Sequence, residues 1–332
     1  MKKSIFALAA FTVAGATYAQ STVTLYGKID ASVQNTSTTG QPSQTKISSG
    51  ALDSSRWGLK GSEDLGGGLK ASFQLESGFS VDTGAVRGAS NLFSRVSKIA
   101  LTGGFGSVSA GLQWTPYDNA WLDALDYNGA SAMNAAFYAG VHGDNGNTGW
   151  GNAKNSIQYA TPDFNGFNAV VMVAPGEDAT PGMSASRYTG FGVNYARGPL
   201  ALSFAQETLT PVGSGTNTNG WILTGSYDLK VVNLFAAYER GSSPTTDETG
   251  YSLGAALPLG ANMKLAASYA SETTDFKAAG ADDKTTAFGA TLVYNMSART
   301  NVYGAYLRSE YTPGGGSGIT TGTFSLGVRH NF

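Results

Sequence analysis

The chain has 332 residues, with 21 Lys and Arg against 23 Asp and Glu and a formal net charge of −2 at pH 7, which gives no basic surface for nucleic acid. It has no cysteine, which excludes a disulfide framework, and its 45 glycines show no Gly-X-Y period, which excludes collagen. No run of about eighteen apolar residues occurs, so the sequence predicts no membrane-spanning helix.

Residues 1–19 have the pattern of a secretory signal. Met1-Lys2-Lys3 is basic, Ile5 to Val13 is apolar, and Thr17-Tyr18-Ala19 fits the small-x-small cleavage pattern. We predict a signal peptide over 1–19 that is cut after Ala19. No change of composition marks a boundary in the remaining residues, 20–332, so we expect them to form one domain.

Most of the mature chain alternates apolar and polar residues with a period of two. The clearest segments are 22–33, 69–76, 262–269 and 284–294. In 69–76 the residues of one face are Leu69, Ala71, Phe73 and Leu75, and those of the other are Lys70, Ser72, Gln74 and Glu76. This period is typical of β-strands and not of helices.

Short connections alternate with long polar ones along the chain. The short ones are 63–68, 103–106, 162–166, 197–199, 228–230, 258–261 and 295–298. The long ones are 35–51, 80–91, 114–152, 174–187, 208–219, 241–249, 272–283 and 311–320. Strands counted between them number about sixteen, an even number that suits an all-β, antiparallel transmembrane β-barrel of the bacterial outer membrane. A soluble sandwich or propeller is the alternative, but it has no reason to separate short turns from long loops so regularly.

The connection 114–152 differs from the others. It is about forty residues long, and loops of that length are usually functional or disordered. Its aromatic residues argue against disorder; they are Trp114, Tyr117, Trp121, Tyr127, Phe137, Tyr138 and Trp150. Asp118, Asp123 and Asp126 lie together in its first half. We interpret it as a loop that folds inside the barrel.

The last strand ends in an aromatic residue. Phe324, Leu326, Val328, His330 and Phe332 share one face of the terminal segment. We expect this strand to pair with the first one, which would leave no unpaired edge in lipid. Phe332 is therefore predicted to serve barrel closure and assembly.

Several motifs, taken in this order, resemble one known family. They are VTLYG at 23–27, SRWGLKGSEDLGGG at 55–68, GGFGSV at 103–108, QWTP at 113–116, NSIQY at 155–159 and the terminal Phe332. Over its whole mature length the chain resembles the general porins of Gram-negative outer membranes, most closely the neisserial and burkholderial branch. The resemblance implies a homotrimeric, sixteen-stranded channel filled with water, through which ions and small hydrophilic solutes diffuse passively. It also implies that the third external loop, here 114–152, forms the constriction.

In such a pore, charged groups at the narrowest point sort the solutes. The resemblance places Arg56 and Arg95 on the barrel wall, opposite Asp118, Asp123 or Asp126 on the loop. Alternation alone directs Arg56 inward, opposite in phase to Trp57. Alternation also directs Lys28, Lys60 and Lys70 inward, and we interpret these three as solvated lysines without a role.

Two positions depart from the family pattern. Leu112 and Asn152 stand where members of the family often carry a basic residue. We therefore expect a weak anion preference or none.

One stretch conflicts with simple alternation. If Arg95 points inward, continuous alternation turns Ile99 and Leu101 inward and Lys98 outward, where a lysine in lipid would be costly. A wrong register, a strand irregularity or a contact with another subunit would each resolve the conflict, and the resemblance favours the subunit contact.

Other functions find less support in the sequence. His142 and His330 have no visible catalytic partner, and no G-x-S-x-G, H-E-x-x-H or P-loop motif occurs, so we expect no enzyme, cofactor or metal. A substrate-specific channel for a sugar or a small acid is an alternative that suits the loop aromatics, and an adhesin built on the external loops is another. The sign of the ion selectivity stays open.

Overall fold

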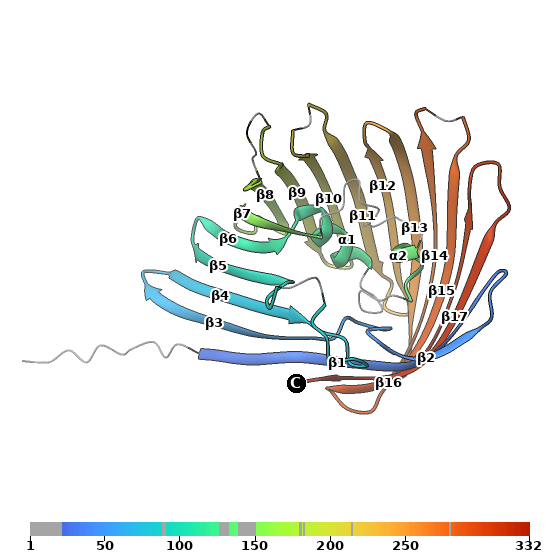
Figure 1. Ribbon diagram of the computed structural model, residues 1–332. Coiled ribbons are helices and arrows are strands. Elements are labelled where there is room, and N and C mark those ends of the chain that lie inside the picture. The colour runs from blue at the N-terminus through green and yellow to red at the C-terminus, as the bar shows by residue number, and fades with distance from the viewer. Residues whose placement is uncertain are drawn as a thin grey trace, which may run out of the picture.

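The computed structural model describes residues 22–87, 91–125, 133–138, 151–178, 181, 183–213, 215–278 and 280–332 (Figure 1). The signal peptide prediction for 1–19 lies outside these residues. The strands are β1 (Thr22–Thr38), β2 (Gln44–Ser49), β3 (Arg56–Gly66), β4 (Leu69–Gly78), β5 (Val96–Gly103), β6 (Gly106–Trp114), β7 (Asn152–Ala160), β8 (Phe167–Pro175), β9 (Arg187–Arg197), β10 (Leu200–Thr210), β11 (Thr218–Asp228), β12 (Asn233–Ser242), β13 (Thr246–Leu259), β14 (Met263–Phe276), β15 (Asp283–Asn295), β16 (Thr300–Thr312) and β17 (Ile319–Asn331). Two helices, α1 (Pro116–Leu125) and α2 (Ala135–Tyr138), lie between β6 and β7.

The strands form one antiparallel sheet that closes on itself. β1 pairs with β17 from Lys28–Asn331 to Thr38–Thr321, so the last strand meets the first as predicted. β2 and β3 pair with the same edge of β1, β2 along Ala31–Thr36 and β3 along Thr22–Lys28. The two therefore act as one interrupted wall strand, and the described strands make a closed sixteen-stranded barrel, which confirms the predicted fold class.

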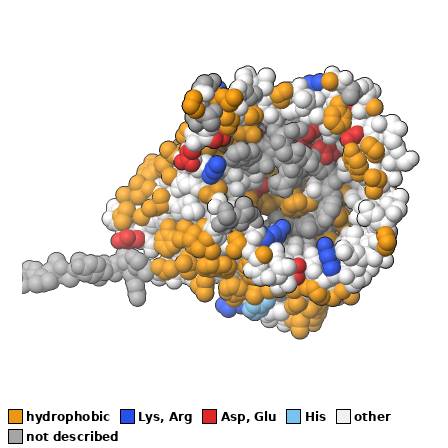
Figure 2. Space-filling model, viewed as in Figure 1, with side chains coloured by type: hydrophobic (Ala, Val, Ile, Leu, Met, Phe, Trp, Pro, Cys, Tyr) orange, Lys and Arg blue, Asp and Glu red, His pale blue; other side chains and the backbone are white. Residues whose placement is uncertain are grey.

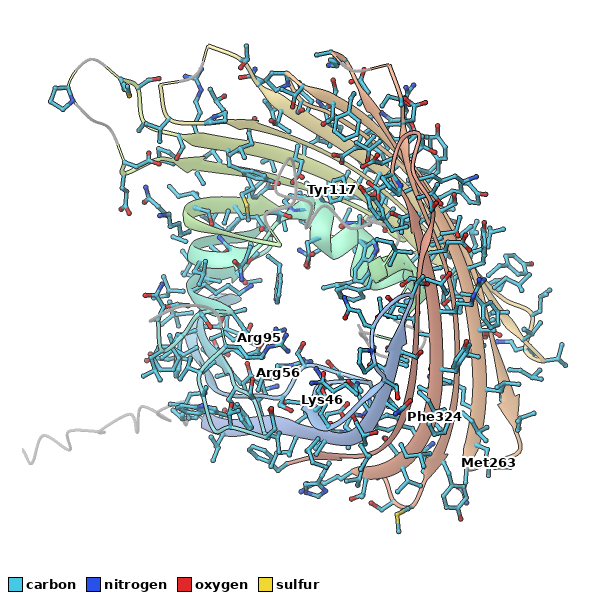
Figure 3. All side chains as sticks on the ribbon, turned by 45° about the vertical axis from the view of Figure 1, so that its right-hand side comes forward. Lys46, Arg56, Arg95, Tyr117, Met263 and Phe324 are labelled. Carbon is cyan, nitrogen blue, oxygen red and sulfur yellow. The ribbon has the colours of Figure 1, made fainter. Side chains whose placement is uncertain are left out.

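Side chains of the wall strands alternate between the outer and the inner surface of the barrel, as predicted. Large apolar side chains are exposed on the outer surface, among them Val23, Leu25, Phe324 and Leu326. Figure 3 shows Phe324 and Met263 pointing away from the interior, and apolar side chains cover much of the outside in Figure 2. The inner face is largely polar or small, as a hydrated interior requires, and large apolar residues on it, such as Ile222 and Leu307, are buried.

Several strands are longer than predicted, because polar segments expected to be loops continue the sheet. β12 ends at Ser242 and β13 begins at Thr246, inside the predicted loop 241–249. The predicted loop 35–51 contains the end of β1 and the whole of β2. Both faces of such extensions are polar, so alternation gives no signal there, although Thr and Ser pair readily in sheets.

Lys98 on β5 points inward, which resolves the conflict at this strand. Ile99 and Leu101 are exposed on the outer surface by 62% and 39%, and the inner face of β5 carries Lys98 and Ala100. Arg95 precedes the first residue of β5 and still reaches the interior. The irregularity lies at the start of the strand, so the outer face of β5 gives no reason of its own for a subunit contact.

Candidate functional site: a charged narrowing inside the barrel

The segment between β6 and β7 turns into the barrel through a capped helix. Thr115 accepts a hydrogen bond on Oγ1 from the backbone N–H of Asp118 at 3.1 Å, and Pro116 begins α1. This is the usual arrangement of an N-cap threonine followed by proline at the first helical position. Asp118 lies in the first turn, where a carboxylate is favoured by the helix dipole. The capping therefore fixes the direction in which the segment enters the interior.

α1 packs against β10–β12 and α2 against β14 and β15. Tyr117, Ala120 and Trp121 form a buried cluster with small or apolar wall residues, namely Ala205, Ile222, Ala237, Ala256 and Ala266. Four of these five wall residues are alanines, whose short side chains leave space for the helix. A Cβ at Gly289 on β15 would lie 2.5 Å from the carbonyl oxygen of Met133, so the wall has room for Met133 here only because residue 289 has no side chain.

Three hydrogen bonds anchor the segment to this wall. Thr224 donates its hydroxyl to the carbonyl oxygen of Ala120 at 2.9 Å, and the N–H of Ala135 donates to Ser268 Oγ at 3.1 Å. The Tyr117 hydroxyl donates to Glu239. Burial raises the pKa of the Tyr117 phenol well above its usual value. The segment is thus fixed to one side of the barrel.

The opposite wall carries a network of arginines and acids. Arg56 Nη1 lies 2.9 Å from Asp53 Oδ1, and Arg95 Nε lies 2.7 Å from Glu76 Oε1. Arg56 Nε also lies 3.7 Å from Glu76 Oε2. The arginine side chains are 20% and 23% exposed, but those of Asp53 and Glu76 only 6% and 7%. The cations therefore meet the water of the lumen, and the carboxylates lie behind them.

Residues 50–55, between β2 and β3, bring Asp53 into this network. The side chain of Asp30 on β1 accepts hydrogen bonds from the N–H groups of Leu52 and Asp53 at 2.9 and 2.7 Å, which holds the bend against the wall. Asp53 then pairs with Lys28 and Arg56 and lies 3.8 Å from Arg329 Nη1. Lys28 therefore has a structural partner, unlike the solvated lysine expected from the sequence.

The two sides meet across one cavity of about 230 Å³. Arg56, Arg95 and Glu76 line it from the wall, and Asp118, Trp121 and Leu122 line it from α1. Figure 3 shows Arg56 and Arg95 pointing toward the open interior, with α1 and Tyr117 on the far side. Arg95 also lies over the Trp114 ring, at 5.0 Å from its centroid. Figure 2 shows the hollow at the centre of the molecule, with blue side chains of Lys and Arg at its edge.

The structure places the residues expected at the narrowing as follows. Arg56, Arg95 and Asp118 lie around the same cavity. Asp123 belongs to α1, but its side chain is outside the described part, and Asp126 lies outside the described residues altogether. Phe332 lies at the closure of the barrel, where it exchanges two backbone hydrogen bonds with Gly27.

Three charged residues of the network were not found from the sequence. Glu76 could have been, because it shares the inward phase of Lys70 and Gln74. Asp53 gave no signal, because it sits in an irregular bend beside a predicted loop. Arg329 could also have been found, because Leu326 and Val328 point outward and alternation then directs Arg329 inward.

The described part of the chain has neither a membrane-spanning helix nor a metal-binding cluster. No helix there is both long and apolar enough to cross a membrane. No group of three or more His, Cys, Asp or Glu residues there is arranged to hold a metal ion.

Comparisons with known proteins agree with this architecture. The family model described as "Gram-negative porin" matches residues 4–314. The chain is 34% identical to outer membrane porin protein 32 of Delftia acidovorans over the full length of both proteins. It is 36% identical to major outer membrane protein P.IB of Neisseria gonorrhoeae over 62% of this chain and 56% of that protein. Among solved structures, the anion-selective porin from Comamonas acidovorans superposes with a TM-score of 0.80 at 28% identity, covering 94% of this chain and 100% of that one.

Proposed function

Because the chain belongs to the Gram-negative porin family, its barrel is an outer-membrane channel for ions and small hydrophilic solutes, and we propose that the cavity between Arg56, Arg95 and α1 is its constriction. One observation carries this proposal: the inserted helix and the arginine wall line a single cavity of about 230 Å³. Solutes that pass there meet opposed charges, with arginines on one side and Asp118 on the other. The resulting field lies across the pore axis.

The charges at this level nearly balance. Four cations, Lys28, Arg56, Arg95 and Arg329, stand among the carboxylates Asp30, Asp53 and Glu76 of the wall and Asp118 of α1. Selection at the constriction is therefore mild, and it depends on which charges meet the water. The arginines are the more exposed partners, so removing one of them has a visible effect on ion permeation.

Arg56→Ala is expected to shift the reversal potential toward cation preference in a KCl gradient, because Asp53 and Glu76 then lose one of the cations in front of them. The shift shrinks as the salt rises from about 0.1 M to about 1 M, since the screening length falls from roughly 10 Å to roughly 3 Å. Planar-bilayer recordings measure both quantities.

Arg56→Lys keeps the charge and serves as the matched control, with a reversal potential close to that of the wild type. Glu76→Gln shifts the potential in the opposite direction. An unchanged potential for Arg56→Ala at low salt would place Arg56 away from the constriction. Steady block by one sugar would instead favour a substrate-specific channel.

We propose no catalytic activity for the chain, because its relatives bear the names of porins. His330 lies exposed on the outer face of β17, and His142 lies outside the described residues.

We also propose that the channel is a homotrimer, as the resemblance to the general porins implies. The apolar outer faces of β1 and β5 suit lipid and a neighbouring subunit equally. Mass measurement of the folded protein in mild detergent is expected to give three chains per particle. A conducting particle of one chain would rule the trimer out.

A further inference from the structure

Two lysines lie on the inner wall of the barrel, between the constriction and the short turns. Lys60 on β3 is in register with Gln74 on β4, and Gln74 with Lys98 on β5, so the three side chains form a row across adjacent strands. Thr24 on β1 is the neighbour of Lys60 in the same row. Neighbouring strands are about 4.8 Å apart, so a row of this kind can contact one small ligand.

The row borders a cavity of about 350 Å³. Its polar lining consists of Lys60, Lys98 and Gln74 with the hydroxyls of Thr22, Thr24, Ser62 and Ser72. All of these groups except the glutamine oxygen can donate hydrogen bonds. No carboxylate lines the cavity among the described residues.

The nearby acids are already engaged elsewhere. Glu76 pairs with Arg95 at 2.7 Å and accepts a hydrogen bond from the Tyr26 hydroxyl at 2.9 Å. Tyr26 in turn accepts a hydrogen bond from Gln74 Nε2 at 2.8 Å, and Lys60 Nζ lies 5.1 Å from the centroid of its ring. Tyr26 therefore separates the lysine row from the constriction carboxylate and orients both Gln74 and Lys60.

Neither lysine of the row forms a salt bridge with any described residue. The next inward acid along β3 is Asp64, four residues from Lys60, and it stands in register with Lys70. At about 3.3 Å per residue it lies roughly 13 Å away. The positive charge of the row is thus uncompensated, unlike that of Arg56 and Arg95.

The row lies on the short-turn side of the constriction. Lys60 is four residues from Arg56 along β3, in the direction of the turn to β4, which corresponds to about 13 Å. An anion that has passed the arginines meets these lysines next. The two levels are close enough for successive binding and far enough apart to act as separate sites.

We propose that Lys60 and Lys98, with Gln74 between them and the flanking hydroxyls, form a binding site for small divalent oxyanions on the inner side of the constriction. The site rests on the proposed pore and adds to it the groups that set the sign of its selectivity. Two ammonium groups and several hydroxyl donors match the charge and the acceptor oxygens of a tetrahedral dianion. Because the charges at the constriction nearly balance, the two lysines of this row supply the excess positive charge that decides the sign of the selectivity.

The experiment measures block of chloride conductance by inorganic sulfate in planar bilayers at low KCl, using the full-length channel. Sulfate is expected to lower the wild-type conductance in a saturable way. Lys60→Gln and Lys98→Gln each raise the half-blocking concentration by about tenfold, because a charge-assisted hydrogen bond typically contributes at least that factor. The double variant raises it further and also moves the reversal potential toward cations.

Matched variants separate the site from general charge effects. Lys70→Gln removes an inward lysine that stands opposite Asp64, and it leaves sulfate block unchanged. Lys60→Arg and Lys98→Arg keep the block. Arg56→Ala shifts the reversal potential but leaves the half-blocking sulfate concentration within about twofold, since the two levels are separated by more than one screening length at 0.1 M salt.

The experiment distinguishes failure of the anion site from failure of the proposed pore. A wild-type channel that conducts steadily but shows no saturable sulfate block overturns the site and leaves the pore intact, and so does equal block of the wild type and the double variant. Absence of steady conductance in the wild type overturns the proposed pore itself. Electrophoretic mobility of unheated samples establishes that each variant has folded.

Discussion

Removal of residues 119–147 is expected to leave a folded barrel that admits larger neutral solutes than the wild type does. The wall does not depend on the segment for its pairing, because β6 and β7 already meet where the segment leaves and returns, at Trp114–Asn152. Liposome swelling with a series of neutral sugars measures the change. The size limit rises by a clear step, since the deletion removes most of α1 and all of α2 from the interior.

The extent of the widening follows from the wall that the helices cover. Ala205, Ala237 and Ala256 project little into the lumen, and their short side chains leave the volume now filled by Trp121 and its neighbours. Without the segment that volume becomes water. The exposed wall then contains buried apolar residues such as Ile222, so we also expect a modest loss of thermal stability.

A deletion in a different external loop serves as the control. Shortening the connection between β8 and β9, residues 176–186, removes chain outside the inserted segment and leaves the size limit unchanged. Tyr117→Phe is a milder variant, which removes the hydrogen bond to Glu239 and loosens α1 without deleting it. If the trimmed protein keeps the wild-type size limit, the segment does not form the narrowest part of the pore.

Much of the barrel could be predicted from alternation, because one face of each wall strand meets an apolar phase and the other meets water. This held for β1, β4, β14 and β17, and for the inward direction of Arg56. It failed where the backbone departs from the regular pleat. Arg95 lies just outside β5, so counting from it reversed the assignment of Lys98 and Ile99.

The site was predictable only in part, because it is made by contacts between segments far apart in the sequence. Arg56 and Arg95 were predicted to face the lumen, and they do, but their acidic partners Asp53 and Glu76 were not predicted. The sequence predicted that loop carboxylates face the arginines across water. In the structure the nearest acids belong to the same wall, and Asp118 lies across the cavity. Alternation gives the direction of a side chain but not its partner.

Deletion of Phe332 is expected to lower the amount of folded channel several-fold without changing the selectivity of the channels that do form. Phe332 exchanges two backbone hydrogen bonds with Gly27, from its N–H at 3.0 Å and to its carbonyl oxygen at 3.1 Å. Without them, two polar groups of Gly27 lose their partners at the seam of the barrel. Each unsatisfied group costs on the order of several kcal/mol if it lies in hydrocarbon, and less if water reaches it.

The ring of Phe332 contributes to the same closure. A Cβ at Gly27 would lie 2.5 Å from the ring, so the aromatic side chain covers the glycine of the first strand. Gly27→Ala is therefore expected to displace the ring and also to press on the Arg56 carbonyl oxygen, 2.6 Å from the added Cβ, so it lowers the amount of folded protein through both contacts. Phe332→Tyr keeps both the ring and the backbone bonds and is the matched control.

The fraction of heat-modifiable protein in the outer membrane measures folding, and bilayer recording measures selectivity. Because Phe332 lies on the outer face, 41% exposed, it has no route to the ions in the lumen. Normal folded yield with altered selectivity would contradict a role in closure and would place the end of the chain at the pore.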